Sequence, residues 1–357
     1  MNCCVAKDDL LHPEKASFCS GFLSKKHGIC RKSCKFASLF TSYQLKLYMV
    51  INLLLIVVGI IVVLWGADRL TDGAVALAER MKLSQMVIGL TIVALGTSMP
   101  EFFVSLMSAL KGTTDLAVGN VVGSNIFNAM LIVGCAALVM PMSILRSTVR
   151  KDIPFALLAS IMLMLMCLDG TISRLDAALL FAALLVFFYV SLKGSKPDNS
   201  AEVQRGEPYS VAKAVMLVVI GLAGLVVGSN VFVDNASALA GRLGLSEAVI
   251  GLTIVAGGTS LPELATSIVA ARKGNSGIAI GNVLGSNVMN ILFILGLTGL
   301  ISPMTINGIT WIDLSMLGIS MLLLWIFSFT KYRIERWEGA VLVAIFLLYM
   351  GSLIAGA

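Results

Sequence analysis

The sequence predicts an all-α membrane protein with ten transmembrane helices, arranged as two inverted five-helix repeats. Three observations favour this fold class: an apolar composition, recurring apolar runs of about twenty residues, and a forty-residue segment that occurs twice. The 357-residue chain is 58% hydrophobic and 13% charged, with a mean hydropathy of +0.94. Too little polar sequence remains to cover the surface of a soluble protein of this size.

Ten apolar runs are each long enough to cross a hydrocarbon core of about 30 Å. We expect these spans over residues 50–67, 86–109, 116–139, 153–168, 175–192, 214–233, 248–270, 277–300, 310–329 and 339–356. The polar stretch 193–211 then divides the chain into a first five-helix repeat, residues 49–192, and a second, residues 212–357. This stretch is expected to be a linker, because it is too short for a folded domain.

The first 48 residues stand apart from this pattern. They contain five of the seven cysteines, both histidines and eight lysines or arginines. They lack the ordered regions of a secretory signal, and their cysteine and histidine spacings fit no common zinc pattern. We expect residues 1–48 to be a disordered leader, or an upstream extension of a chain whose native start is Met49.

Lysines and arginines alternate between the loops. Leaving out the leader and Arg69, the loops after spans 1, 3, 5, 7 and 9 hold 14 of them, whereas the loops after spans 2, 4, 6 and 8 hold 3. The positive-inside rule places the first set of loops, including the linker, in the cytoplasm and both ends of the bundle outside. Adding the leader's eight basic residues to the outer side would remove this contrast, which favours a bundle that begins at Met49.

The internal repeat has a constant offset of 162 positions. Residues 89–128 and 251–290 are identical at 23 of 40 positions, with no insertion or deletion. Weaker matches, such as Gly66 with Gly228, extend the repeat upstream, so that each unit covers about five spans. Five is an odd number, so the second unit enters the membrane from the opposite side. Inverted repeats of this kind are common in secondary transporters, which hold their substrate between the halves.

Each repeat carries the pattern Gly-Thr-Ser-x-Pro-Glu in the middle of its second span. The acids are Glu101 and Glu263, and a carboxylate inside a membrane indicates a functional site because its burial is costly. Pro100 and Pro262 lack an amide hydrogen and clash with the carbonyl four residues earlier, in the first half that of Gly96. We therefore expect a broken helix in each half, with freed carbonyls that serve as oxygen ligands.

Hydroxyl and amide side chains recur at helical spacing around the two acids. Four-residue spacing places a threonine and a serine on the face of each glutamate: Thr97 and Ser105 beside Glu101, and Thr259 and Ser267 beside Glu263. The next span of each half carries Gly-Asn-x-x-Gly-Ser-Asn, which aligns three polar residues: Asn120, Ser124 and Asn128, then Asn282, Ser286 and Asn290. The glycines of this motif also permit close helix packing.

The candidate ligands are all oxygen atoms, which suits a hard cation. Ca2+ accepts six to eight oxygen ligands in flexible geometry, whereas Mg2+ demands a near-ideal octahedron. After Met49 the chain has no histidine and only Cys135 and Cys167, which argues against zinc, copper and nickel. No phosphate-binding loop of the GxxxxGK[ST] type is present, so we expect a second ion gradient rather than ATP as the energy source, and no cofactor.

At these residues the sequence resembles the calcium/cation antiporter superfamily, and within it the bacterial sodium/calcium exchanger-like branch. Both motifs occur twice and in order, and the resemblance extends from Met49 to Ala357. It implies a plasma-membrane antiporter, not an enzyme, that alternates its access by sliding the first and sixth helices over the others. It implies calcium ligands at Glu101, Glu263, Thr97 and Thr259. It implies sodium ligands at Ser98, Ser124, Ser260 and Ser286 with the carbonyls of Ala94 and Ala256, and polar positions one helix away at Asn128 and Asn290.

One position departs from the family pattern. Many sodium/calcium exchangers carry an aspartate where this chain has Asn290, so two central carboxylates remain rather than three. The coupling ion and the stoichiometry stay open, and a proton-coupled calcium exchanger is the alternative within the same class. An intramembrane enzyme that uses Glu101 and Glu263 as an acid/base pair, or a passive cation channel, is the alternative in another class. Duplicated acids in broken helices favour transport, with Ca2+, Na+ and the lipid bilayer as partners and no nucleic acid.

Four further polar residues lie at the ends of the first and sixth spans. They are Asp68, Asp72, Asn230 and Asp234. Two interpretations are open for them: they cap helices or face the loop solvent, or they take part in a gate or an ion entry.

Overall fold

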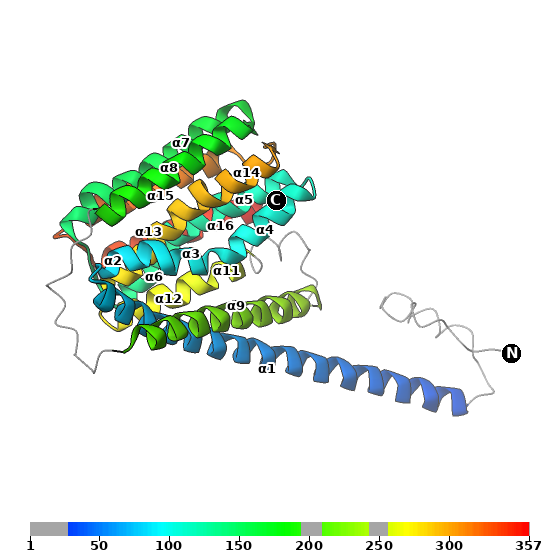
Figure 1. Cartoon of the computed structure of the whole chain (residues 1–357). Coiled ribbons are helices and arrows are strands. Elements are labelled where there is room, and N and C mark those ends of the chain that lie inside the picture. The colour runs from blue at the N-terminus through cyan, green and yellow to red at the C-terminus, as the bar shows by residue number, and fades with distance from the viewer. Residues whose placement is uncertain (1–27, 194–208, 243–255, 357) are drawn as a thin grey trace. The chain divides into compact units, whose positions relative to one another are not determined.

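The computed structural model describes residues 28–193, 209–242 and 256–356, and most of these residues are helical (Figure 1). Residues 53–357 form one compact unit, whose arrangement is given below. Of the other residues, the structure describes the stretch from Gly28 to Asn52, which is helical. The predicted leader therefore falls partly on this helix, while residues 1–27 lie outside the described residues.

Helices long and apolar enough to cross a membrane occur at nearly every predicted position. Within the described residues there are eight such helices, and a pair bent by 47° makes a ninth crossing. The remaining predicted span, residues 248–270, contains α11 and α12, and its first part, residues 248–255, lies outside the described residues.

Each predicted span of the first half coincides with helix. The elements are α1 (Gly28–Met81), α2 (Gln85–Ile88), the π-helix η3 (Gly89–Val93), α3 (Ala94–Thr97), α4 (Met99–Leu110), α5 (Thr114–Ile126), the π-helix η4 (Phe127–Ile132), α6 (Val133–Val139), β1 (Met142–Ser143), the π-helix η5 (Thr148–Asp152), α7 (Ile153–Met166), the 3-10 helix η6 (Cys167–Asp169), β2 (Thr171–Ile172) and α8 (Arg174–Lys193).

The described part of the second half follows the same order. Its elements are α9 (Val211–Arg242), α11 (Ala256–Thr259), α12 (Leu261–Arg272), α13 (Ser276–Val288), the π-helix η8 (Met289–Leu295), α14 (Gly296–Ile301), β3 (Met304–Thr305), α15 (Trp311–Ser328), β4 (Arg333–Ile334) and α16 (Arg336–Gly356). The long helix α15 starts with a capping box, in which Thr310 and Asp313 each bond the other's backbone amide.

Two short antiparallel sheets join the halves. β1 pairs with β4, with Met142 opposite Ile334, and β2 pairs with β3, with Ile172 opposite Met304. The repeat offset of 162 positions carries β1 onto β3 and β2 onto β4. Each sheet therefore takes one strand from each half, and the repeat symmetry exchanges the two sheets. β1 and β4 lie in the loop set rich in lysine and arginine, whereas β2 and β3 lie in the other set.

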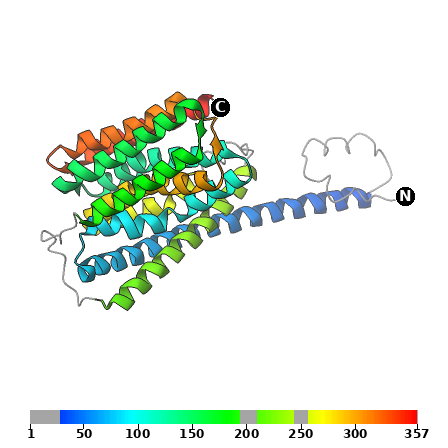
Figure 2. The same cartoon turned by 45° about the horizontal axis from the view of Figure 1, so that its top comes forward.

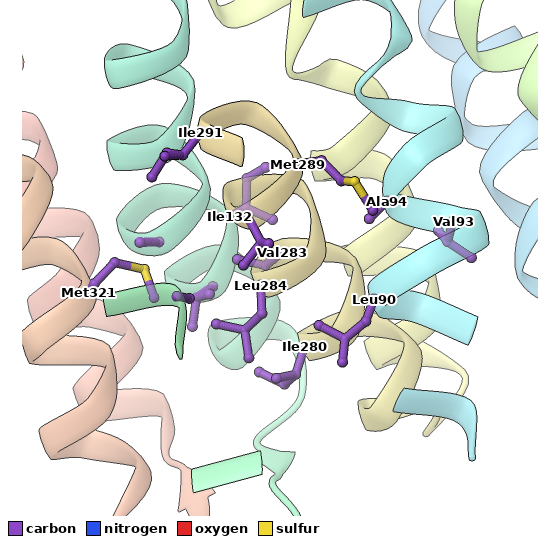
Figure 3. Packing of buried hydrophobic residues seen from close by; sticks show 14 of the residues in the cluster. Leu90, Val93, Ala94, Ile132, Ile280, Val283, Leu284, Met289, Ile291 and Met321 are labelled. Atoms are coloured by element: carbon purple, nitrogen blue, oxygen red, sulfur yellow. The ribbon is translucent and has the colours of Figure 1, made fainter. Parts of the chain in front are cut away.

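The core lies around the span formed by α13, η8 and α14, which is buried over almost its whole length. Figure 3 shows Leu90 beside Ile280, with Leu284 on the same helix, and all three side chains are buried. A Cβ atom added to Gly281 or Gly285 would lie 2.6 Å from a backbone carbonyl oxygen of the second span. The predicted role of the motif glycines in close helix packing is thus confirmed for the second half. In the first half, a Cβ on Gly119 would meet only a side-chain atom of Ile309 and one on Gly123 would meet no atom within 4 Å among the described residues, so the prediction is wrong there.

α1 and α9 lie side by side and touch through their backbones (Figures 1 and 2). A glycine recurs every seven residues on α1, and each meets a small residue of α9. The pairs are Gly59 with Gly228, Gly66 with Gly221, and Gly73 with Ala214. An added Cβ on any of these α1 glycines would lie within 2.9 Å of a carbonyl oxygen of α9. At these three positions the backbones of the two helices lie against each other, so α1 and α9 form one close-packed pair.

Candidate ion-binding site

Both second spans break at the serine of the Gly-Thr-Ser-x-Pro-Glu pattern. Ser98 separates α3 from α4 with φ −82° and ψ 7°, and Ser260 separates α11 from α12 with φ −89° and ψ 7°. The predicted break is confirmed, but it does not occur at Gly96, which remains helical in α3. The proline lies in the first turn of the next helix, where its missing amide hydrogen has no helical partner to lose.

Glu101 and Glu263 both lie in the first turn of the helix that follows the break. They are 1% and 0% exposed. Each accepts a hydrogen bond from a serine of the opposite half: the hydroxyl of Ser260 donates to Oε1 of Glu101, and that of Ser98 to Oε1 of Glu263, both over 3.1 Å. The positive end of a helix dipole also favours a carboxylate at this position. The two acids therefore share one polar cluster built from both halves.

The serines of the third and eighth spans complete this cluster. Ser286 donates to Oε1 of Glu263 over 3.4 Å. In the other half the hydroxyl of Ser260 lies 3.4 Å from that of Ser124, so Ser124 reaches Glu101 through a second hydroxyl. The equivalent serines of the two halves, Ser124 and Ser286, thus make different hydrogen bonds.

The two acids of the cluster, and Asn128 and Asn290 on the spans that follow them, have unpaired buried polar atoms. Within the described residues, no hydrogen-bond partner is present for Oε2 of Glu101, Oε2 of Glu263, or either polar atom of Asn128 and Asn290. All four residues are at most 1% exposed. Buried polar atoms without partners are costly, and a bound cation would satisfy the oxygens of these four residues. Other described residues, such as Asn125 and Glu338, also have unpaired buried atoms, so the two carboxylates within the spans carry the argument. Asn128 and Asn290 also lie in π-helices, η4 and η8, which occur frequently at functional sites.

Ser105 and Ser267 do not flank the carboxylates as expected. Their hydroxyls donate to the carbonyls of Ala117 and Ala279, over 3.2 and 3.4 Å. Each serine instead bonds a backbone carbonyl of the span that follows, and the amide of Asn120 or Asn282 donates to its hydroxyl. They fasten each second span to the span that follows it.

Asn120 and Asn282 hold the backbone of the two acids in place. The amide of Asn120 donates to the carbonyl of Glu101, and that of Asn282 to the carbonyl of Glu263, both over 3.2 Å. Asn282 also accepts a hydrogen bond of 3.1 Å from the hydroxyl of Thr97, a residue of the first half. These asparagines act as braces around the cluster rather than as members with free ligand atoms.

The other predicted ligands lie at the helix break. Ala94 and Ala256 are the first residues of α3 and α11, and Thr259 is the last residue of α11. The carbonyl of Ala94 accepts the amide of Ser98 over 3.0 Å and the hydroxyl of Thr97 over 3.3 Å. The proposed sodium binding by Ala94 and Ala256 and the proposed calcium binding by Thr259 stay predictions.

Ser229 is a polar residue near the break that sequence reasoning missed. Its buried hydroxyl, on α9, donates to the carbonyl of Gly258 over 2.5 Å. That carbonyl lies four residues before Pro262, so it has no helical amide donor. The repeat places Ala67 at the matching position of the first half. The sequence did contain a signal for this residue: a serine, Ser229, stands in one repeat where the other has Ala67.

Comparison with known proteins covers both halves of the chain. The profile of the sodium/calcium exchanger protein family matches residues 51–193 and again residues 213–355. The putative antiporter CaxA of Alkalimonas amylolytica is 35% identical over 84% of this chain and 98% of its own. The sodium/calcium exchanger MaX1 of Methanosarcina acetivorans is 33% identical over 84% of this chain and 97% of its own.

A solved structure is similar to this fold over nearly its full length. A structure of the sodium-calcium exchanger NCX_Mj aligns with a TM-score of 0.76 and 31% sequence identity, over 85% of this chain and 99% of that one. Together with the family profile, which matches once in each half, this similarity confirms the predicted fold class: ten membrane helices in two inverted five-helix repeats.

Proposed function

Because this chain belongs to the sodium/calcium exchanger family, we propose that it exchanges Ca2+ for Na+ by alternating access at a site between Glu101 and Glu263. The coarser assignment is direct: the chain is a multi-pass membrane antiporter of the sodium/calcium exchanger type. The named relatives are exchangers or antiporters, which favours transport over an intramembrane enzyme.

The observation that carries the proposal is the set of unpaired oxygens in the buried cluster. Glu101, Glu263, Asn128 and Asn290 each have an oxygen atom without a partner among the described residues. Two of these oxygens belong to carboxylates, so together they suit a divalent hard cation. We assign the remaining calcium coordination to Thr97 and Thr259. The sodium ligands that we propose are Ser98, Ser260, Ser124, Ser286 and the carbonyls of Ala94 and Ala256.

Exchange follows from the charge of this site. Without an ion, two carboxylates would be enclosed together away from water, which is unfavourable. Ca2+ or Na+ offsets that charge, so the site closes and reopens on the other side only when it is loaded. Because Ser98 and Ser260 each bond the carboxylate of the opposite half, a movement of one half changes the ligands of both acids at once.

The loop charges give the proposed orientation. The lysine- and arginine-rich loops, with the linker 193–211, lie in the cytoplasm, and both ends of the bundle lie outside. The expected location is the plasma (inner) membrane. The repeats 49–192 and 212–357 then face the membrane in opposite directions.

Flux measurements in liposomes test the function. The purified full-length chain is reconstituted, and uptake of radioactive Ca2+ is followed with Na+ inside and none outside. We expect uptake that stops when the Na+ gradient is collapsed with an ionophore and that is unchanged when only a pH gradient is removed. Uptake driven by the pH gradient alone would instead identify the proton-coupled exchanger, and uptake independent of both gradients would indicate a channel.

Ser98→Ala and Ser260→Ala are expected to weaken Ca2+ binding. Each substitution removes a donor to a buried carboxylate, and hydrogen bonds to charged groups contribute about 1.5–3 kcal/mol. The Ca2+ concentration for half-maximal uptake should therefore rise by about tenfold or more. The matched control is Ser352→Ala, because Ser352 is exposed on α16 and its hydroxyl donates to the carbonyl of Tyr349 in the same helix. Equal affinities for all three variants and the parent would exclude these serines from the site.

A further inference from the structure

One lysine ties α1 to the core at the end of α12. Nζ of Lys273 lies 2.6 Å from Oδ1 of Asp68 and 2.7 Å from Oδ1 of Asp72. It also donates to the carbonyl of Asp68 over 3.3 Å. The three side chains are between 29% and 36% exposed. Asp68 and Asp72 are one turn apart on α1, so the lysine bridges both of them at once.

The other repeat contains the equivalent residues, but they do not form an ion pair among the described residues. The offset of 162 positions carries Lys273 onto Lys111, which follows α4, and carries the two aspartates onto Asn230 and Asp234 of α9. Lys111 and Asp234 are exposed, and neither makes an ion pair in the part of the chain that the structure describes. The contact between the lysine and the acids is thus formed in one repeat and absent from the described part of the other.

The cluster is coupled to the site through a rigid element. Glu263 lies in the first turn of α12, and Lys273 directly follows its last residue. The two residues are ten positions apart, which corresponds to about 15 Å of helix. On the other side of the ion pair, α1 is joined to α9 along the glycine seam. A bond at Lys273 therefore fixes the α1–α9 pair relative to the helix that carries one of the two acids.

We propose that Lys273, Asp68 and Asp72 are positioning residues of the transport cycle, whose ion pair holds one end state, and that Lys111 and Asp234 form the counterpart in the other. This rests on the proposed exchange function. In inverted repeats, alternating access interchanges the arrangements of the two halves. A shift of the α1–α9 pair that brings Asp234 to Lys111 takes Asp68 and Asp72 away from Lys273. Because Asn230 replaces one acid, the counterpart has a single carboxylate, and the state with Lys273 paired is favoured at rest.

Cross-linking of the open pair, with Lys273 varied at the other end, tests this coupling. Lys111→Cys and Asp234→Cys are introduced into the full chain after its seven native cysteines have been replaced by serine and exchange has been verified. A short bifunctional methanethiosulfonate reagent then measures how often residues 111 and 234 approach. Adding Lys273→Gln should increase the rate of cross-linking by about two- to fivefold, the range expected for a partly exposed ion pair.

The control is Lys151→Gln, which removes an exposed lysine of the same loop set outside this cluster. It should leave the rate unchanged. In a second variant pair, Asp72→Cys with Lys273→Cys should cross-link readily without ions, and the cross-link should stop exchange until it is reduced.

If Lys273→Gln does not change the rate of cross-linking between residues 111 and 234, the proposed role of the Lys273 ion pair is refuted. Such a result in a protein that still exchanges Ca2+ for Na+ leaves the proposed function intact. Loss of exchange in the unmodified chain would refute the function itself, so the two failures are distinguishable.

Discussion

Replacing Glu263 or Glu101 with glutamine is expected to abolish sodium-driven Ca2+ uptake while the protein still folds. Glutamine keeps the size of the side chain and can accept the serine hydroxyl, but it removes half of the negative charge that faces the ion. Removing one partner of a buried charged interaction costs about 3–5 kcal/mol, which corresponds to at least about a 100-fold loss of Ca2+ affinity. Uptake in liposomes and Ca2+ binding by calorimetry measure the effect.

Glu79→Gln is the matched control, because Glu79 lies on α1 and is exposed. It should transport like the parent. Aspartate at position 263 keeps the charge on a shorter side chain, so it should retain part of the activity. A Glu263→Gln protein with full uptake would refute the assignment of the two acids, whatever the fate of the other ligands.

Gly66→Ala or Gly221→Ala is expected to disrupt the α1–α9 pair. A Cβ at position 66 would meet the backbone nitrogen of Leu225 at 2.7 Å, and a Cβ at position 221 would meet the backbone nitrogen of Leu70 at 2.5 Å. Backbone atoms cannot turn aside as a flexible side chain does, so the helices must move apart. Overpacking of this kind costs about 1–3 kcal/mol. We expect a lower denaturation midpoint in detergent and a severalfold slower uptake.

Gly351→Ala is the control for this pair of substitutions. A Cβ on Gly351 of α16 would meet no atom within 4 Å, so only the higher helix propensity of alanine remains. Its midpoint should equal that of the parent or exceed it slightly. If Gly66→Ala matched Gly351→Ala in both measurements, the seam would not be the contact that joins α1 and α9.

The two acids and their amide neighbours could be found from the sequence because each is a local contradiction. Glu101 and Glu263 are charged residues in apolar runs, and Asn128 and Asn290 are amides with no reason to face lipid. Such residues indicate a site whatever the tertiary arrangement of the helices is. The ten-helix fold could be predicted for a related reason, since the apolar runs and the odd number of spans per repeat leave few arrangements.

The partners of these residues could not be predicted. Helical spacing relates residues within one helix, and it suggested Ser105 as the neighbour of Glu101. The observed neighbour is Ser260, which is 159 positions away and belongs to the other half. The turn at Ser98 or Ser260 lies between each acid and the threonine four residues before it, so helical spacing fails there. Ser105 and Ser267 share a helix with the acids, but their hydroxyls bond the span that follows. The π-helices around Asn128 and Asn290 have the same effect, because they add a residue to the turn.

The differences between the repeats were also beyond the sequence. A duplicated motif implies equal roles, yet Lys273 is paired while Lys111 is exposed and makes no ion pair among the described residues. One conformation of an inverted repeat places matching residues in different surroundings. Which of the two is closed depends on tertiary packing rather than on the local pattern.

The two small sheets have a consequence for how the chain is made. Chains are synthesised from the N-terminus, and early segments begin to fold before later ones exist. β2 can pair only after β3 has been made. β1 is made before β2, but its partner β4 is made after β3, so the pair β2–β3 can form before the pair β1–β4. We therefore expect the first five helices to be made while β1 and β2 still lack their partner strands, β4 and β3. The repeats share their motifs and element order, but neither can complete its structure until the last loop of the chain has left the ribosome.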